Sequence, residues 1–375
     1  MKRRDQGPRP RHTGSLDAST TQPSDDGGHA IADLDAVNDP AWAQLVDQRS
    51  TSIFHAQRWL GVLADTYGFP IRARVLSDRT GAPCAGLVYA PIDDFMDNRI
   101  GSPPFSDFCD PLAVDDHEWR ALVDGLLARG CRVDLRCLHN DVAARDDRFG
   151  VVDRALWHAI DVRGDEHEMW QALPGAARRA LRKAGSDGVR VMIGETEADM
   201  RAFYELHLRV RKYKYGLLAQ PYLFFSNLWH RCLATGHGVL LLATVDDRVV
   251  GGVVFLEWQD TLYYKFNASD PSHLGARPND RVLWEGIGHA RARGLRRVDL
   301  GLTAADQDGL VRYKRKYATE EKTITLLRHQ PLGSPSARDQ QARSVLRDVT
   351  RLLTDVSVPD EVSERAGDAL YRYFA

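Results

Sequence analysis

The stretch of sequence richest in groups that can do chemistry runs from residue 297 to residue 318. A short apolar strand, Val298 to Leu300, is followed by Gly301 at a turn and then by a helix dense in cations. The cations of that helix are Arg312, Lys314, Arg315 and Lys316. A strand end that leads directly into a helix is a place where α/β folds hold anionic ligands. The stretch therefore predicts a site for an anionic substrate.

Three other residues near this stretch are candidates for the same site. Asp299 lies at the strand end, where its carboxylate could orient Lys314 or accept a proton from an amine, or could simply satisfy backbone groups. Tyr313 precedes Lys314, and we expect it to line a cleft. Tyr264, in the predicted strand 261–267, is a second candidate for the cleft, although packing in the core is the stronger interpretation.

Two further groups of cations and caps could meet an anion. Arg211 and Lys212 end a predicted helix, where they could bind phosphate or only interact with the helix dipole. Arg277 and Asn279 precede the predicted helix 282–293, and capping is the favoured interpretation of Asn279. Arg277 could reach an anion at the start of that helix.

Other catalytic patterns are missing from the sequence. No nucleophile elbow, zinc-protease helix, Walker loop or dinucleotide-binding glycine pattern follows a strand. The five cysteines are isolated and the histidines have no metal-ligand spacing, so we predict neither disulfides nor a metal. The apolar runs are too short to span a bilayer and no apolar stretch follows the basic N-terminal residues, so we expect a cytoplasmic protein.

The net charge of −2 conceals an asymmetry along the 375 residues. Residues 30–167 contain 14 basic and 23 acidic residues, whereas residues 168–329 contain 25 basic and 18 acidic residues. Opposed charges of this kind have three interpretations. The two halves are domains that face each other, or one half binds an anionic ligand, or the charges are only solvated faces of unlike sign.

Composition and periodicity divide the chain into four parts. Residues 1–29 are rich in Pro, Gly, Ser and Asp, and we expect a disordered tail whose deletion leaves activity intact. Residues 30–164 alternate helical and strand patterns in a mixed α/β domain. Residues 165–330 form a second domain, and residues 331–375 a linker and helical tail that packs on the body or on a second subunit.

The second domain has an informative order of elements. Its pattern predicts β-α-α-β-β-β-α-β-α-β, with two tight hairpins between residues 239 and 267. Pro174 is expected to interrupt the first helical stretch. The strand 261–267 and the strand at 298 are joined by a helix, so we expect them to be parallel neighbours.

This element order is that of the GNAT acyltransferase fold. The chain also resembles the FemAB-like peptidyltransferases and the related BioF2-like acetyltransferase domain over about residues 45–330. The markers of the resemblance are Phe54 with Trp59, Ser102-Pro103-Pro104-Phe105, Leu181-Arg182-Lys183-Ala184, Leu206-His207 with Arg211, Arg277-Pro278-Asn279 with Trp284-Glu285, Asp299 with Gly301, and Gly309-Leu310 with Tyr313-Lys314. The resemblance implies two tandem GNAT-like domains, the first degenerate, with mixed central sheets flanked by helices.

The resemblance also implies roles for individual residues. Lys314 matches the family lysine near the acceptor and the reacting carbonyl, where a cation can stabilise an oxyanion or hold a phosphate. Arg211 and Lys212 match family cations that bind acceptor phosphates. We therefore expect Lys314 and Asp299 to be catalytic and Arg211, Lys212, Arg277, Asn279, Tyr313 and Tyr264 to bind substrate.

The sequence departs from the family and from ordinary GNAT proteins at defined places. Tyr313 and Ala318 stand where the family more often has Phe and Gly. The acetyl-CoA-binding loop with paired glycines is replaced by Arg277-Pro278-Asn279-Asp280, which argues against ordinary acetyl-CoA use. FemAB-like proteins, which take aminoacyl groups from tRNA, also lack that loop.

These observations predict an acyl- or aminoacyltransferase that modifies an amine, possible acceptors being phosphorylated cell-wall or nucleotide-linked precursors. The donor would be aminoacyl-tRNA, with no permanently bound cofactor, and neither DNA nor a membrane span is involved. An acyl-CoA-dependent N-acetyltransferase of polysaccharide or secondary metabolism is the alternative enzyme. A non-catalytic module that binds RNA or a protein partner is the alternative of another class.

Overall fold

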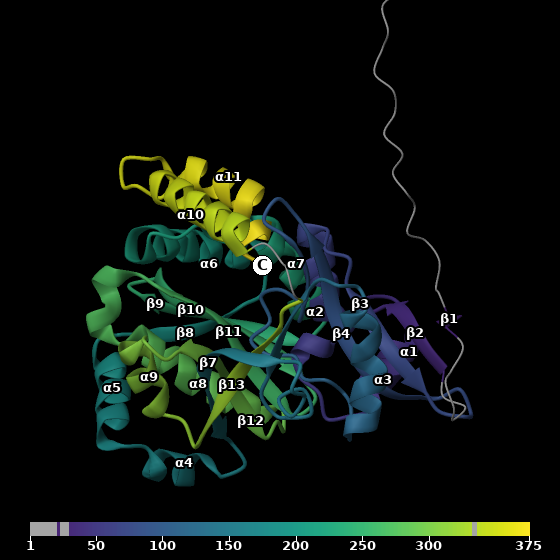
Figure 1. The fold of residues 1–375 in the computed structure, drawn as a ribbon. Coiled ribbons are helices and arrows are strands. Elements are labelled where there is room, and N and C mark those ends of the chain that lie inside the picture. The colour runs from purple at the N-terminus through teal and green to yellow at the C-terminus, as the bar shows by residue number, and fades with distance from the viewer. Residues whose placement is uncertain (1–20, 23–29, 332–335) are drawn as a thin grey trace, which may run out of the picture.

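The structure is a computed structural model that describes residues 21–22, 30–331 and 336–375 (Figure 1). Most of the tail 1–29 and part of the linker 331–339 lie outside these residues. The described strands form one sheet of 13 strands in the order β1-β2-β3-β4-β5-β6-β13-β7-β12-β11-β10-β9-β8. Their bounds are β1 Thr21–Gln22, β2 Ala30–Asp35, β3 Arg72–Ser77, β4 Pro83–Asp93, β5 Asn98–Gly101, β6 Arg132–Cys137, β7 Gly150–Asp161, β8 Arg190–Gly194, β9 Gly238–Val245, β10 Arg248–Trp258, β11 Thr261–Ser269, β12 Arg297–Ala304 and β13 Glu320–His329.

Helices cover both faces of this sheet. The α-helices are α1 Pro40–Gln48, α2 Gln57–Tyr67, α3 Asp116–Leu127, α4 Glu166–Ala172, α5 Gly175–Ser186, α6 Glu197–Arg209, α7 Tyr222–Leu228, α8 Pro278–Ala292, α9 Asp308–Arg315, α10 Ser336–Leu353 and α11 Asp360–Leu370. Short 3-10 segments are η1 Ile53–His55, η4 Pro271–Ala276 and η5 Tyr371–Phe374, and α6 and α7 continue into the π-helical segments η2 Val210–Lys214 and η3 Trp229–Leu233.

The alternation of side chains along β9 shows which core lies on each face of the sheet. Leu240 and Leu242 point into the core formed with α6 and α7, whereas Leu241 and Ala243 point into the core formed with α8. Successive side chains of a strand point to opposite faces, so an apolar run of this kind is typical of a strand buried on both sides. The sheet is therefore the central layer between two helical layers (Figure 1).

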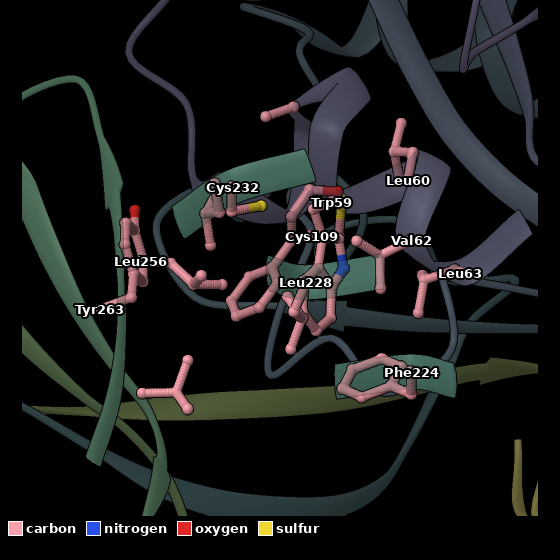
Figure 2. Close-up of a cluster of buried hydrophobic side chains, with 14 of the residues drawn as sticks. Trp59, Leu60, Val62, Leu63, Cys109, Phe224, Leu228, Cys232, Leu256 and Tyr263 are labelled. Atoms are coloured by element: carbon pink, nitrogen blue, oxygen red, sulfur yellow. Dashed lines mark hydrogen bonds between the residues drawn. The ribbon is translucent and has the colours of Figure 1, made fainter. Parts of the chain in front are cut away.

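The two halves of the chain, residues 30–164 and 165–330, share one hydrophobic core. Figure 2 shows where they meet: Trp59 of α2 lies among Phe224 and Leu228 of α7, with Leu256 of β10 and Tyr263 of β11 nearby. The ring of Trp59 packs edge-on against Phe224 with centroids 6.0 Å apart. The first half is thus packed into the second and is not a separate body on a linker.

Strands from the two halves also alternate within the sheet. β7, from the first half, lies between β12 and β13 of the second half, and pairs antiparallel with both. β13 in turn lies between β6 and β7 of the first half. The domain boundary predicted at residues 164–165 remains a prediction, but a cut there would separate β7 from both of its neighbours.

Several expectations for the second half are confirmed. The helix break falls at Pro174, between the end of α4 and the start of α5. β11 and β12 are parallel neighbours, joined through α8. In the first half, α1 and the short strands β2 and β5 are present although the sequence pattern gave no prediction for them.

The C-terminal helices pack on the body of the protein, against α6 (Figure 1). Apolar side chains of α10 differ in their surroundings: Val345 and Leu352 are 57% and 71% exposed, whereas Leu353 packs partly buried against the core. Leu346 and Thr350 are the buried residues of α10, and Thr354, directly after the helix, is buried as well.

Candidate functional site

A cavity of about 580 Å³ opens where β11 and β12 separate. The two strands pair only from Thr261 with Arg297 to Tyr263 with Asp299, and beyond this point they diverge. β12 bulges after Asp299 and resumes its pairing with β7 at Leu302. We call this space the fork cavity; its lining includes Asp107, Lys214, Tyr264, Lys265, Arg277, Asn279, Gly301, Tyr313 and Lys314.

Lys314 reaches this cavity from α9 and is only 5% exposed. Its Nζ donates hydrogen bonds to the backbone oxygens of Gly301, at 2.9 Å, and Leu302, at 3.0 Å. An ammonium has three N–H groups, so one remains for a substrate oxygen. Burial lowers the pKa of Lys314 to about 8, although the nearby carboxylates of Asp107 and Asp299 oppose this change. Lys314 is therefore a cation at neutral pH, and the carboxylates of Asp107 and Asp299 favour its charged form.

The first half of the chain contributes Asp107 to the cavity. Its Oδ1 accepts a hydrogen bond from Lys265 Nζ of β11 at 2.7 Å. Burial raises the pKa of Asp107, but the charge and hydrogen bond of Lys265 outweigh burial and hold the pKa below its ordinary value. Lys265 also lies 4.7 Å from the centre of the Phe54 ring, so its ammonium is fixed from two sides.

Gly301 allows these groups to approach one another. Its φ is +71°, a conformation that L side chains rarely adopt, and a Cβ atom there would lie 2.7 Å from Asp107 Oδ2. Leu302 N is 3.4 Å from the same carboxylate oxygen. The glycine predicted as a turn residue thus lets the β12 bulge pass between Asp107 and Lys314.

Asp299 lies on the opposite side of this strand end. Its Oδ1 accepts the N–H of Gly301 at 2.6 Å, and no hydrogen bond joins it to Lys314 among the described residues. The side chain is 3% exposed and lines a second cavity, of about 460 Å³, between the two halves of the chain. We call it the interface cavity. Burial raises the pKa of Asp299 to about 7, and the negative charge of Asp107 acts in the same direction.

The start of α8 forms one wall of the fork cavity. Arg277 precedes the helix with a φ of +64°, and Pro278 is its first residue. Asn279 Oδ1 accepts a hydrogen bond from Asn267 at 2.9 Å and another from Ser269. Asp280 is buried and accepts hydrogen bonds from Lys316 and Tyr317 of the segment around α9. Asn279 and Asp280 therefore hold the cavity wall in place.

Two tyrosines cover the inside of the cavity. Tyr313 donates its hydroxyl hydrogen bond to the backbone oxygen of Asn279 at 3.1 Å. Tyr264 is half-buried, packs edge-on against Phe255 and lies beside the Tyr313 hydroxyl. Burial raises the pKa of both phenols, so they stay neutral. They supply apolar surface with a polar end, suited to the body of an acyl group.

Arg211 and Lys212 do not reach the fork cavity. Arg211 Nε donates to the backbone oxygen of Leu218 at 3.0 Å. Lys212 is 2% exposed and forms an ion pair with Asp360 of α11 at 2.8 Å. The next cation, Lys214, lines the cavity instead. The π-helical turn of η2 redirects this basic run, so residues adjacent in sequence have different destinations.

Sequence reasoning missed Lys265 and Lys214. Lys265 is a lysine within a strand of apolar and aromatic residues, which is the signal that could have revealed it. Asp107, from the loop that follows Pro104 in the first half, also lines the cavity. Lys214 and Arg277 form no ion pair with any described residue, so the mouth of the cavity carries positive charge that an anionic ligand can neutralise.

Comparison with known proteins identifies the class of the fold. Residues 175–315 match the family model described as an acetyltransferase (GNAT) domain. The structure of FemX is similar at 12% identity, covering 82% of this chain and 98% of that chain with a TM-score of 0.58. L-PGS from Bacillus licheniformis is similar at 10% identity, covering 85% and 97%, with a TM-score of 0.53.

A tandem GNAT protein from the clavulanic acid biosynthesis pathway is also similar, at 12% identity, covering 82% of this chain and 100% of that chain with a TM-score of 0.50. Comparison of the sequence with curated proteins gives no significant match. Residues 175–315 thus match a GNAT acetyltransferase domain, and the chain as a whole has a fold like those of FemX and the tandem GNAT protein. The fold class expected from the sequence is confirmed, and the expected resemblance to GNAT acyltransferases is confirmed over residues 175–315.

Three features of the described residues bear on other classes of site. No group of three or more His, Cys, Asp or Glu side chains has an arrangement that could hold a metal ion. All five cysteines are free thiols. Within the described part of the chain, every helix is too short or too polar to cross a bilayer.

Proposed function

We propose that the protein is an N-acyltransferase that moves an activated aminoacyl group onto an amine, with the reaction centred in the fork cavity. The observation that carries the proposal is the buried ammonium of Lys314, held at the separation of β11 and β12 with one N–H left for a substrate. A fixed cation in a site of low water content favours the negative charge that develops on a carbonyl oxygen during acyl transfer.

The chemical step needs few protein groups. The amine nitrogen forms a bond to the carbonyl carbon, and the bond from that carbon to the ribose oxygen of tRNA breaks. The proton lost by the amine balances the proton gained by the leaving hydroxyl. Lys314 stabilises the oxyanion, while Asp107 fixes Lys265 and the β12 bulge around it. Positioning of this kind supplies a large share of the rate enhancement.

The start of α8 favours tRNA over acyl-CoA as the source of the acyl group. A pyrophosphate binds where successive backbone N–H groups at a helix start are free. Here Pro278 has no N–H, and the buried Asp280 carboxylate in the first turn already supplies negative charge. Lys214 and Arg277 are suited to phosphates at the mouth, which fits a tRNA end or a phosphorylated acceptor.

The acceptor in this proposal is an amine on a phosphorylated or nucleotide-linked precursor, such as one of the cell wall. The FemX and L-PGS neighbours support acyl transfer only through their shared fold. The acyl-CoA-dependent N-acetyltransferase remains the second candidate, because residues 175–315 match an acetyltransferase domain. The same cavity would then hold a thioester.

A donor comparison tests the proposal. The purified chain is given a cell-wall precursor carrying a free amine, with either a mixture of charged tRNAs or acetyl-CoA, and the amide product is measured by mass spectrometry. We expect product with charged tRNA, and tRNA binding that weakens steeply with salt. Product with acetyl-CoA alone would show that the second candidate is correct.

Substitution of the central lysine separates an enzyme from a binding module. Lys314→Met keeps the length of the side chain and removes the charge, and we expect the transfer rate to fall by roughly 10²–10³ while the protein stays folded. Arg312→Met, on the exposed side of the same helix, is the matched control and should change the rate little. An unchanged rate in Lys314→Met would favour the non-catalytic module.

A further inference from the structure

The turn at residues 103–106 has an unusual residue at its third position. The N–H of Ser106 donates to the backbone oxygen of Pro103 at 3.3 Å, and the φ of Phe105 is +59°. Proline cannot adopt a positive φ, so a turn with Pro104 second and a positive φ third has the geometry of type II. That third position ordinarily holds Gly or Asn, because a bulky side chain is strained there. The conformation of Phe105 is therefore held by contacts outside the turn.

Two tyrosine rings hold Phe105 in this conformation. The centre of its ring lies 5.0 Å from that of Tyr67 in α2 and 5.2 Å from that of Tyr371 in η5. The rings of Tyr371 and Tyr67 stack on each other with centroids 6.2 Å apart. Tyr371 is buried, so its ring belongs to the core and not to the surface. Removal of this ring would take away one of the two closest ring neighbours of Phe105.

Ion pairs fasten the segment that carries Tyr371. α11 leads directly into η5, and Asp360 at the start of α11 pairs with the buried Lys212 of η2 at 2.8 Å. One turn later, Glu364 pairs with Arg201 of α6 at 3.1 Å. These pairs join α11 to α6 and η2, and they thereby fix the ring of Tyr371 against the body of the protein.

The backbone of the same turn faces the fork cavity. The carbonyl oxygen of Phe105 accepts a hydrogen bond from Lys265 Nζ at 3.2 Å, and Asp107 Oδ1 accepts another at 2.7 Å. Asp107 Oδ2 accepts the N–H of Leu302, in the bulge of β12, at 3.4 Å. Lys265 and Asp107 both line the cavity. Phe105 therefore contacts the C-terminal segment through its ring and a cavity residue through its carbonyl oxygen.

We propose that Tyr371 is a positioning residue for the fork cavity, which sets the places of Lys265 and Asp107 through Phe105. The contacts are continuous, since the ring of Phe105 packs on Tyr371 and its carbonyl oxygen binds Lys265. A strained residue persists only where the surrounding structure holds it, and such residues cluster at functional sites. The effect on rate rests on the proposed function, but the placement of the side chains can be measured without a reaction.

The backbone N–H signal of Leu302 in nuclear magnetic resonance reports the placement of Asp107. We expect this signal to move in Tyr371→Ala and to stay in place in Tyr371→Phe, which keeps the ring. Tyr373→Ala is the matched control, because this tyrosine of the same segment packs on Phe95, with centroids 4.8 Å apart. An unmoved Leu302 signal in folded Tyr371→Ala, or an equal movement in Tyr373→Ala, would overturn the proposal.

Phe105→Gly tests the same contact from the side of the body, where the C-terminal segment keeps its other contacts. Glycine adopts the positive φ without strain, but the ring that Tyr371 contacts is removed. We expect the Leu302 signal to move in Phe105→Gly and to move no further when Tyr371→Ala is added, since residues that act through one contact have nonadditive effects. An unmoved signal in Phe105→Gly, or two movements that simply add, would overturn the proposal.

The transfer assay supplies the functional measurement. We expect Tyr371→Ala to lower kcat by roughly 10–100-fold with little change in KM for tRNA, because the cavity wall is displaced while Lys214 and Arg277 at the mouth are untouched. Tyr371→Phe should restore the natural rate, and an unchanged kcat in folded Tyr371→Ala would overturn the proposal. A natural protein that forms no product would contradict the proposed function, and the Leu302 signal would still decide the positioning.

Discussion

Burial lowers the pKa of Lys314 and raises the pKa of Asp299, because it penalises the charged form of each side chain. Hydrogen bonds to backbone groups keep both in place: Lys314 donates to Gly301 and Leu302, and Asp299 accepts from Gly301. Both side chains therefore carry a cost in stability that a binding partner can offset. Such perturbed groups in a cavity are typical of functional sites.

The cost at Asp299 leads to a prediction about stability and pH. The native pKa, about 7, lies above the ordinary value of 3.8, so the folded state holds a proton that the unfolded state has released between these values. Stability from this group is therefore lost as pH rises from about 4 to about 7. Asp299→Asn removes this dependence of stability on pH. The free energy of unfolding of the variant, relative to that of the natural protein, should therefore increase over that range, by at most ~4 kcal/mol.

Denaturant unfolding at pH 5 and pH 8 measures this difference. Asn retains the acceptor for the Gly301 N–H, so the backbone contact survives. Asp153→Asn, on β7, serves as the control and should show no such trend, since that carboxylate is exposed. A free-energy difference between Asp299→Asn and the natural protein that is the same at both pH values would contradict the prediction.

At the scale of elements, the end of β12 is the part that least tolerates change. Gly301→Ala combines an unfavourable φ with a Cβ atom against Asp107, so we expect destabilisation of roughly 1–3 kcal/mol and a larger loss of transfer activity. Gly309→Ala in α9 has no atom within 4 Å of the new methyl group and should be neutral or slightly stabilising. Unfolding curves and the tRNA-dependent assay together check both variants, and a fully active, stable Gly301→Ala would contradict this account of the bulge.

The elements themselves were largely predictable from the sequence, because β9, β10 and β11 are apolar runs separated by two-residue turns and Pro174 marks a helix break. The candidate site was predictable in part. Lys314, Tyr313, Tyr264, Arg277 and Asn279 do meet in the fork cavity, but Lys314 was selected through a family resemblance and not by its spacing. Lys212 and Lys214 could not be distinguished, since the π-helical turn that separates their directions leaves no local signal.

At the scale of the whole molecule, the alternation of strands explains why no local pattern gives the arrangement of the two halves. β7 pairs with β12 and β13, both more than a hundred residues later in the chain. The shared core around Trp59 and Phe224 joins the halves a second time (Figure 2). Periodicity reports which face of a strand is buried and does not report which strand lies beside it.

This arrangement predicts cooperative behaviour. We expect residues 30–330 to unfold in one calorimetric transition, because neither half can complete its sheet alone. Residues 30–164 and 165–330 produced separately should be aggregated or poorly folded, and should recover a native-like circular dichroism spectrum when produced together. Two well-separated transitions, or a soluble folded fragment 165–330, would show that the halves are independent domains.

The position of β13 also has a consequence for synthesis of the chain on the ribosome. β6 and β7 are among the early products of translation, yet the strand that fills the space between them is residues 320–329. Until that segment has left the ribosome, two apolar strand edges of the first half have no native neighbour, and exposed edges invite pairing with other chains. The nascent protein should therefore depend on protection, by chaperones or by slow release, until almost its last residues have been made.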